Sequence, residues 1–421
     1  MSTIIVKLAN SGADAATSSG APAVRSIGGR PMRALSNNEV QNIANTEITI
    51  EADLSKKDRA ELEDSDEHLL AEEIPLKLVG PIPSDPSGIT TEAADAGQVS
   101  WGIRATGAEN STYDGRGIRV AVLDTGIDKD HPAFSDPALS ITTANFTNDV
   151  PEDTDGHGTH CAGTIFGRDV NDTRIGVARG INEAFIAKVI PAGSSALVSA
   201  LNWAYDNKCH VASMSLGFDF PRFVHQETLR GVPFMAAVSS GLTQYRNNIA
   251  VLDALMDLYR ARELQAGEHG MIVVAASGNE SNRSNFTIAS APPSAAMGII
   301  SVGAISQNSG GSFNVAPFSN TGPDVVAPGV NVLSARAQLG DLVSMNGTSM
   351  ACPHVAGIAA LYFQRAIQGL GAAPNAGGVA AEIKVLARKI GLTLSDGGSG
   401  LAVAPKSVSY THLTLPTTPY V

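Results

Sequence analysis

Residues 118–124 read Ile-Arg-Val-Ala-Val-Leu-Asp, an almost unbroken run of β-branched and aliphatic residues that ends on a carboxylate. Such continuity is typical of a strand buried on both faces, because a half-exposed strand alternates apolar and polar residues. Helical patterns follow at 194–206 and 349–367. Strands that alternate with helices predict βαβ units around a mostly parallel sheet, and hence an α/β fold. Further strands of this kind are predicted at 185–190, 211–214, 271–276, 299–302 and 325–326.

The composition limits the class of protein. The 421 residues are 43% hydrophobic, which is enough to bury a sizeable core and excludes wholesale disorder. The net charge of −12 argues against nucleic acid or an anionic membrane surface as the main partner, since both attract basic proteins. The sequence contains no apolar run of about 18 residues, so it predicts no membrane-spanning helix.

The cysteines and the first residues bear on the compartment. Cys161, Cys209 and Cys352 are too few for a disulfide framework and fit a reducing compartment. We expect Cys161 and Cys352 to be small buried core residues. The N-terminus lacks the basic start and apolar core of a signal peptide, so the sequence favours a cytoplasmic location.

The first 97 residues differ from the rest. Residues 47–73 hold eleven acids and three bases. Two interpretations are open: a disordered, solvated acidic region, or a small β/α segment with strands near 48–50 and 74–79 and a helix at 54–62. A linker rich in proline, including Pro81 and Pro83, then reaches about residue 97.

The main domain is predicted to span residues 98–405, and one stretch within it, 218–270, exceeds a simple strand–helix alternation. Apolar residues from Ile249 to Tyr259 have helical spacing there, which predicts a helix packed on the core by its apolar face. A lid or recognition element is the alternative. Residues 406–421 resemble the translation of a sequencing adapter, and we expect them to be a non-native tail.

Two polar residues stand where a catalytic site of an α/β fold would form. Asp124 ends the first core strand, and ligands of such folds lie at the carboxyl ends of the strands. His157 lies in Asp-Gly-His-Gly-Thr-His, where the glycines allow close backbone approach. Asp124 alone could cap a helix. Pairing His157 with His160 gives only a weak zinc signal, so we expect His160 to be packed and hydrogen-bonded.

Two further residues have both an ordinary and a catalytic interpretation. Ser349 opens an apolar helix, where a serine usually caps the N-terminus, but a nucleophile there gains from the positive end of the helix dipole. Asn279 follows Ala-Ser-Gly after another strand. It is either a turn residue or an amide that donates to a developing oxyanion.

These segments, taken in their order, resemble the subtilisin-like serine proteases, the subtilase family or peptidase family S8, in which the triad runs Asp, His, Ser. Further matching motifs are Ser-Met-Ser-Leu-Gly at 213–217, Gly-Pro-Asp-Val-Val-Ala-Pro-Gly at 322–329 and Gly-Ser-Gly-Leu-Ala-Val-Ala-Pro at 398–405. The resemblance covers roughly residues 98–405. It implies a three-layer fold with a mostly parallel central sheet and a serine endopeptidase acting on polypeptides.

The resemblance also implies the role of each matching residue. Ser349 would be the nucleophile, His157 the general base and acid, Asp124 the residue that orients it, and Asn279 an oxyanion donor. Because a neutral imidazole must accept the proton, we expect a neutral-to-alkaline optimum. The N-terminal segment would be a prosegment that inhibits the enzyme until it is cleaved within about 80–100. Substrate would be bound by Ser215, Leu216 and Gly217 on one side and by Ala276, Ser277 and Gly278 on the other.

The family chemistry implies no cofactor, and we predict no metal ligand. Ala133 replaces the aspartate of many calcium-binding relatives. Asp169, Asn171 and Asp172 could offer oxygens to a structural calcium ion, although a solvated turn is the ordinary interpretation. Two other functions stay open: a non-catalytic binding module, which retention of all four site residues disfavours, and ester hydrolysis or transpeptidation by the same triad.

Overall fold

The computed structural model describes residues 2–7, 37–52, 54–65, 67–80, 98–266, 269–370 and 375–406. The predicted linker at 81–97 and all but the first residue of the predicted tail lie outside these ranges, so both remain predictions.

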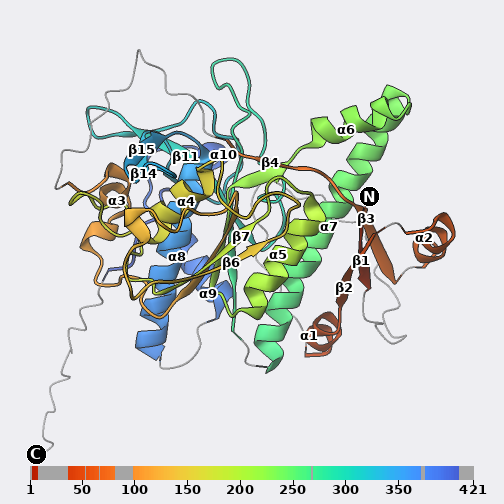
Figure 1. Ribbon diagram of the computed structural model, residues 1–421, viewed down its shortest axis with the longest axis horizontal. Helices are drawn as coiled ribbons and strands as arrows, with labels where there is room; N and C mark the ends of the chain where they lie inside the picture. Colours follow the sequence, from red (N-terminus) through yellow and green to blue (C-terminus); the bar gives the residue numbers. More distant parts are fainter. Residues whose placement is uncertain are drawn as a thin grey trace, which may run out of the picture.

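A central sheet of eight strands forms the middle of the main domain (Figure 1). Its order is β12-β11-β10-β8-β5-β7-β6, with β13 also paired to β11, and only the β11–β12 pair is antiparallel. The predicted mostly parallel sheet is confirmed. The strands are β5 (Arg119–Asp124), β6 (Ser140–Asn145), β7 (Glu183–Lys188), β8 (Val211–Met214), β10 (Ile272–Ala276), β11 (Ile299–Gln307), β12 (Phe313–Val315) and β13 (Val325–Pro328).

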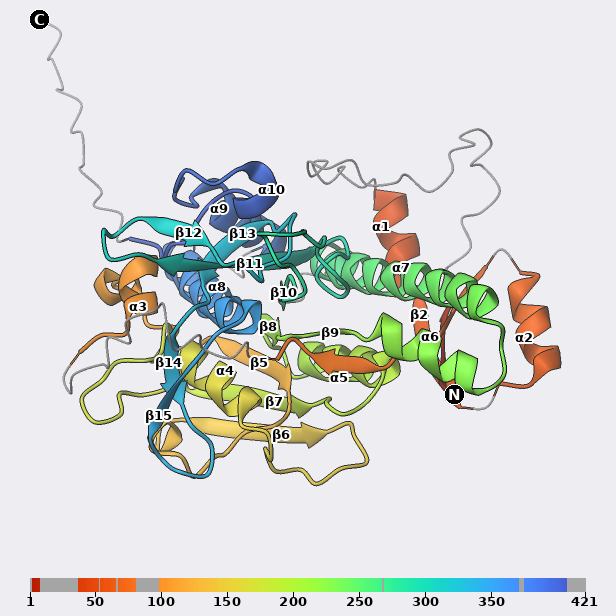
Figure 2. The same ribbon diagram turned by 90° about the horizontal axis from the view of Figure 1, so that it is seen from above.

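Helices cover both faces of this sheet, which makes the three layers expected from the sequence (Figure 2). Strand β5 shows the physical reason, because successive side chains of a strand point to opposite faces. Val120 and Val122 pack in one apolar cluster with α4 and α8, whereas Ala121 and Leu123 pack in another with α5 and α7. The main-domain helices are α3 (Trp101–Thr106), α4 (His157–Phe166), α5 (Ser194–Asp206), α6 (Phe220–Leu229), α7 (Phe234–Ala266), α8 (Thr348–Leu370), α9 (Ala376–Val385) and α10 (Leu394–Gly397).

The described part of the N-terminal segment adopts the β/α arrangement rather than a solvated tail. Strands β1 (Ser2–Lys7), β2 (Glu47–Ala52) and β3 (His68–Glu72) form an antiparallel sheet in the order β2-β1-β3. Helices α1 (Asn37–Ala44) and α2 (Lys56–Glu63) accompany it. Ile4 and Val6 are fully buried in the apolar cluster that also contains α5 and α7, so this small sheet shares a core with the main domain.

The 218–270 stretch forms α6 and the long helix α7, which confirms the predicted helix. Leu252, Leu255 and Tyr259 of α7 are buried against the central sheet. Helix α7 also lies against α1 and β3, and both views show the small sheet on the side of the molecule away from α3 (Figures 1 and 2). No helix among the described residues combines the length and apolar character needed to cross a membrane.

Short strands and 3-10 turns complete the main domain. Strand β4 (Leu76–Leu78) pairs antiparallel with β9 (Leu216–Phe218), and β14 (Val332–Ala335) pairs antiparallel with β15 (Leu342–Met345). Two 3-10 turns, η1 (Ala108–Asn110) and η2 (Pro132–Phe134), connect larger elements. The β4–β9 pair brings residues of the N-terminal segment next to a predicted substrate-binding strand.

Candidate active site

Asp124 and His157, predicted to act together, are in direct contact. Asp124 ends β5 near the centre of the sheet and is fully buried. Its Oδ1 accepts hydrogen bonds from the backbone N–H of Thr125 and from Nδ1–H of His157, each at 2.8 Å. A buried carboxylate without partners would be costly, and these two donors satisfy Asp124 Oδ1 next to the imidazole.

His157 begins α4 directly after Gly156, whose φ of 91° is a conformation that glycine adopts readily. Because Nδ1 donates to Asp124, Nε2 is the proton-accepting atom, and it is buried with no hydrogen-bond partner among the described residues. Burial acts to lower the pKa of His157, but the charge and hydrogen bond of Asp124, helped by Cys161, raise that pKa well above its ordinary value.

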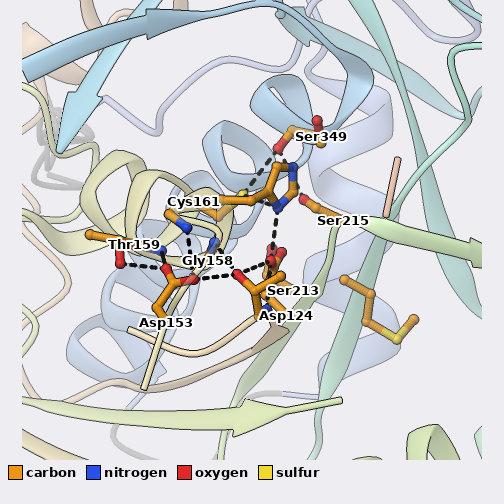
Figure 3. A network of polar contacts seen from close by, with 12 residues as sticks. Asp124, Asp153, Gly158, Thr159, Cys161, Ser213, Ser215 and Ser349 are labelled. Atoms are coloured by element: carbon orange, nitrogen blue, oxygen red, sulfur yellow. Dashed lines mark hydrogen bonds and ion pairs between the residues drawn. The ribbon is translucent and has the colours of Figure 1, made fainter. Parts of the chain in front are cut away.

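A second buried carboxylate, Asp153, fixes the start of α4 and escaped the sequence interpretation (Figure 3). Its Oδ2 accepts from the backbone N–H and the hydroxyl of Thr159, at 2.9 and 2.6 Å. Its Oδ1 accepts from the Thr125 hydroxyl at 2.8 Å, and that hydroxyl in turn accepts from Gly158 N–H at 2.9 Å. Asp153 therefore ties the helix that carries His157 to the strand end that carries Asp124.

Ser349 is the second residue of α8, and the helix ladder is interrupted at this point. Pro353, four residues later, has no N–H to donate to the Ser349 carbonyl. That carbonyl instead accepts from the Ser215 hydroxyl at 2.9 Å and contacts the Cys161 thiol at 3.5 Å (Figure 3). The serine backbone is thus joined to the loop after β8 and to α4.

The Ser349 side chain is oriented toward its neighbour in this structure. Its Oγ donates to Met350 Sδ at 3.4 Å and not to His157 Nε2. In many enzymes the tight nucleophile–base hydrogen bond forms only in the complex with a reacting substrate. Because Ser349 stands in the first turn of α8, its backbone N–H has no acceptor within the helix and can serve an external oxyanion.

Asn279 lies three residues beyond β10 and presents its amide nitrogen to a peptide carbonyl. Its Oδ1 accepts from the backbone N–H and the hydroxyl of Thr348, each at 2.8 Å. This leaves Nδ2 to donate to the carbonyl oxygen of Gly80 at 2.9 Å. Thr348, which the sequence interpretation missed, therefore sets the orientation of the predicted oxyanion donor.

The predicted substrate-binding residues lie in two segments of the chain. In the first segment, 215–217, β9 pairs with residues 76–78 of the N-terminal segment, and Ser215 O accepts from Val79 N–H at 3.2 Å. In the second segment, 276–278, Ala276 and Ser277 are buried and Gly278 has a φ of 110°. All six predicted substrate-binding residues thus lie in the two segments next to Ser349 or Asn279.

Other polar residues named in the sequence have structural partners. His160 is buried, its Nε2 donates to the carbonyls of Val332 and Val343 at 3.0 and 3.1 Å, and burial lowers its pKa to about 3. The prediction of a packed, hydrogen-bonded His160 is confirmed. All three cysteines are free and buried, which confirms the expectation for Cys161 and Cys352, and burial raises the pKa of the Cys161 thiol.

Potential metal ligands are grouped at one place among the residues that the structure describes. The one group of three potential ligands found there is Asp124, His157 and Cys161, which is the predicted catalytic cluster itself. The Asp169 carboxylate pairs with Arg179 Nη1 at 2.7 and 3.0 Å. Asn171 and Asp172 have positive φ values of 48° and 59°, as in a tight turn.

The chain is similar to known proteins over the region that forms this site. The model of the subtilase family matches residues 115–398. Subtilisin Savinase of Lederbergia lenta is 37% identical over 282 residues, 64% of this chain and 86% of that protein. M-protease of Shouchella clausii is also 37% identical, but the matched chain spans only 61% of its length.

A cuticle-degrading serine protease of Arthrobotrys oligospora is 35% identical over 298 residues, 65% of this chain and 61% of that protein. The family match covers Asp124, His157, Asn279 and Ser349 and the strands and helices next to them. The chain therefore belongs to the subtilase family, peptidase family S8, a family of serine endopeptidases.

Proposed function

We propose that this chain is a serine endopeptidase that hydrolyses peptide bonds through an acyl-enzyme on Ser349. One observation carries the proposal. A stretch of the chain's own backbone pairs with β9 and offers the Gly80 carbonyl to the Asn279 amide. A cleft that accepts an extended strand by backbone hydrogen bonds fits a polypeptide substrate.

In the proposed reaction, Ser349 Oγ attacks the scissile carbonyl carbon while its proton passes to His157 Nε2. A C–O bond forms, the carbonyl π bond opens, and the negative charge collects on the carbonyl oxygen. Asp124 keeps Nδ1–H directed at itself and stabilises the imidazolium. His157 then gives the proton to the leaving nitrogen as the C–N bond breaks, and water releases the acyl group by the same steps.

The developing oxyanion would be bound by Asn279 Nδ2 and the backbone N–H of Ser349. Each such donor contributes about 2.7–4 kcal/mol of transition-state stabilisation. Thr348 fixes the Asn279 amide in advance, so little reorganisation is required when the charge forms. The chemistry requires no metal or organic cofactor.

The N-terminal segment is proposed as an intramolecular inhibitor. Side-chain amides of α7 hold strand β3 of the N-terminal segment against the main domain. Asn247 and Asn248 donate to the β3 carbonyls of Leu70 and Glu72, each at 2.8 Å. Gln244 Oε1 accepts from Glu72 N–H at 2.9 Å. These contacts satisfy an edge strand that would otherwise be open. They support the proposal that residues 1–97 are a prosegment and residues 98–405 the peptidase domain. The 218–270 stretch would then be the part of the peptidase domain that holds the prosegment in place.

Occupation of the cleft by residues 76–80 supports inhibition directly. The Gly80 carbonyl takes the oxygen position of a scissile bond, and a substrate cannot bind until this segment leaves. Processing is therefore expected at Gly80 or within the following residues up to about 100. Release of the segment after cleavage would open the site.

The decisive experiment is labelling of the purified full-length chain with a fluorophosphonate probe, followed by intact mass. Ser349→Ala is the matched control. Labelling of the wild type alone, with mass loss from the N-terminus, is the expected result. A folded, fully processed chain that neither labels nor cleaves peptides would contradict the proposal.

Ester hydrolysis and transpeptidation use the same acyl-enzyme and must be separated from peptide hydrolysis. We would compare kcat/KM for a peptide and an ester with the same acyl group, and then add an amine nucleophile. Efficient peptide cleavage with water as the main acceptor is expected. Turnover of the ester alone, or transfer to the amine in preference to water, would favour the alternative.

A further inference from the structure

The turn between α6 and α7 exposes apolar side chains at an outer edge of the molecule (Figure 1). Leu229 ends α6, and Phe234 and Met235 begin α7. The exposed fractions of these three residues are 73, 64 and 76%. Leu242, about two turns further along α7, is 58% exposed. Single exposed apolar residues are ordinary, but a group of neighbours at the surface marks an interaction site.

The two helices pack tightly against each other behind this turn. Phe223 and Val224 of α6 are buried. Gly241 of α7 allows close approach, because a Cβ built there would lie 2.8 Å from Phe220 Cε2 and 3.0 Å from Val224 Cγ2. The Phe220 ring also meets the Tyr245 ring edge-on, with 6.2 Å between their centroids. The helices therefore bury the inner apolar side chains of the hairpin and leave those of the turn outside.

The described part of the N-terminal segment binds the other face of α7. Because an α-helix turns once per 3.6 residues, Met235, Leu242 and Arg246 lie on one face. Gln244 and Asn248, which bind β3, lie on the opposite face. The exposed fractions given above are those of the chain with β3 in place. The apolar group is therefore accessible both before and after the N-terminal segment leaves.

Cations accompany these apolar residues, although the chain as a whole has a net charge of −12. Residues 220–252 contain three arginines and one acid, Glu227. The Glu227 carboxylate is paired with Arg230 at 2.6 Å, and its side chain is only 17% exposed. Arg222 and Arg246 are exposed. The acidity of the chain lies largely in the N-terminal segment. The local charge at the turn therefore attracts an anionic surface, because charges beyond about 10 Å are screened by salt.

We propose that the α6–α7 turn is a docking surface for an anionic lipid bilayer. Leu229, Phe234 and Met235 enter the boundary between head groups and acyl chains, while Arg222 and Arg246 bind lipid phosphates. A fluid bilayer adapts to a protruding turn, whereas a protein partner would need a matching groove. The hairpin lies on the membrane and does not cross it, in agreement with the lack of a membrane-spanning helix in the described ranges.

Docking at this turn holds one end of the cleft near the bilayer. Asp219 directly follows β9 and caps α6, because its Oδ1 accepts from Arg222 N–H at 3.1 Å. The N–H of Asp219 donates to the Pro75 carbonyl of the cleft-bound segment at 2.8 Å. Helix α6 has ten residues and so spans about 15 Å. The docked turn is therefore separated from the entry of the cleft by the length of one short helix.

The test is co-sedimentation of the full chain with lipid vesicles. Ser349→Ala serves as the parent protein, so the result does not depend on peptidase activity. It is expected to bind vesicles of phosphatidylcholine with phosphatidylglycerol, less so at high salt, and to bind phosphatidylcholine alone weakly. Phe234→Ser with Met235→Ser should lower the binding constant about tenfold, because apolar burial is lost. Arg222→Gln with Arg246→Gln should lower it by on the order of tenfold on the anionic vesicles only.

Two control variants remove side chains of the same kinds from other parts of the surface. Val385→Ser with Leu394→Ser removes two apolar side chains that are 79 and 64% exposed. Arg116→Gln with Arg336→Gln removes two exposed cations. Both controls should bind the anionic vesicles as the parent does. Equal losses in the test and control variants, or a parent that binds neither kind of vesicle, would overturn the inference.

Sedimentation equilibrium without lipid examines the other occupant that an apolar turn can have, a second copy of the chain. The parent is expected to be monomeric. A dimer that Phe234→Ser with Met235→Ser converts to monomers would overturn the inference in favour of self-association. Exposed substitutions of this kind change stability little, so the Tm of every variant should stay close to that of the parent. The apolar and the charge variants test the surface separately, and either one can contradict it.

Discussion

The side-chain amide of Asn279 donates a 2.9 Å hydrogen bond to the carbonyl oxygen of Gly80. The donor stands on a loop after the central strand β10, and the acceptor ends the described N-terminal segment. The two residues are far apart in sequence, yet the contact has the form expected between an oxyanion donor and a scissile peptide. It links the proposed catalytic step and the proposed inhibition in one interaction.

Removing the amide should affect the chemical step more than binding. Asn279→Ala is expected to lower kcat by about 10²–10³-fold with a small change in KM, because the donor acts mainly on the transition-state charge. Steady-state kinetics on a peptide substrate provides the measurement. Asn282→Ala, on the following loop, is the control and should retain near-normal kcat. An unchanged kcat in Asn279→Ala would remove this residue from the oxyanion site.

Thr348 should act through Asn279. Thr348→Val keeps the shape but loses the hydroxyl that donates to Asn279 Oδ1 and accepts from Gly278 N–H at 3.1 Å. We expect kcat to fall about tenfold, since one of two bonds that orient the amide is lost. Thr348→Ser should retain activity. In the Asn279→Ala background the valine substitution should have little further effect, and additive losses would contradict this coupling.

The pH profile should report the raised pKa of His157. Catalysis requires neutral His157, so kcat/KM should increase as the pH rises through the pKa of this residue, which lies above the ordinary histidine pKa of 6.5. The stabilisation from protonated His157 is fully present below the unfolded-state pKa and is lost as pH rises through the higher folded-state pKa. Asp124→Asn removes the main interaction that raises the pKa of His157. The acid limb of the pH profile of this variant should therefore shift to lower pH, with kcat reduced by about 10⁴-fold. An unshifted limb would argue against Asp124 as the cause.

Asp153 should contribute to both stability and positioning. Asp153→Ala would leave buried donors of Thr125, Gly156 and Thr159 without their acceptor. We expect the free energy of unfolding to fall by about 2–4 kcal/mol, since each unsatisfied buried group costs about 1–3 kcal/mol and water relieves part of this. Urea denaturation of the Ser349→Ala background, which prevents self-cleavage, provides the measurement. The exposed Asp155→Ala should change stability by under about 0.5 kcal/mol.

The amides of α7 should control how tightly the N-terminal segment stays docked. The double substitution Asn247→Leu and Asn248→Leu leaves two β3 carbonyls without donors. Labelling of Ser349 in the unprocessed chain should become several-fold faster, because the cleft opens more often. Thr243→Ala, at an exposed position of the same helix, should leave the rate unchanged. Equal rates in the wild type and the double variant would show that these amides do not hold the segment.

Much of the fold was predictable because its signals are local. The apolar run ending at Asp124 indicates a strand buried on both faces, and α5 begins and ends at the residues that its apolar spacing predicts, Ser194 and Asp206. The Gly-His-Gly and Gly-Thr-Ser stretches singled out His157 and Ser349 as candidates for the same reason. Each motif is a few residues long and requires no knowledge of distant partners.

Asp153 and Thr348 were missed because their local sequences, although close to His157 and Ser349, do not show which partners these two side chains meet. Their roles come from acceptors and donors that the fold brings to them, namely Thr125 for Asp153 and Asn279 for Thr348. The N-terminal segment also remained ambiguous, since its strands bury their apolar face only against α5 and α7. A short sheet without such a partner is marginal in water.

The sequence by itself determined the family and the α/β class and singled out four candidate site residues, because short motifs and apolar periodicity are properties of neighbouring residues. Only the tertiary structure decided that Gly80 lies at Asn279 and that Lys77 meets Glu280, residues separated by 203 positions. Contacts between residues so far apart in sequence form only when the chain folds and closes long loops. Whether they form depends on how the helices and sheets pack, and local sequence patterns contain no signal for that packing.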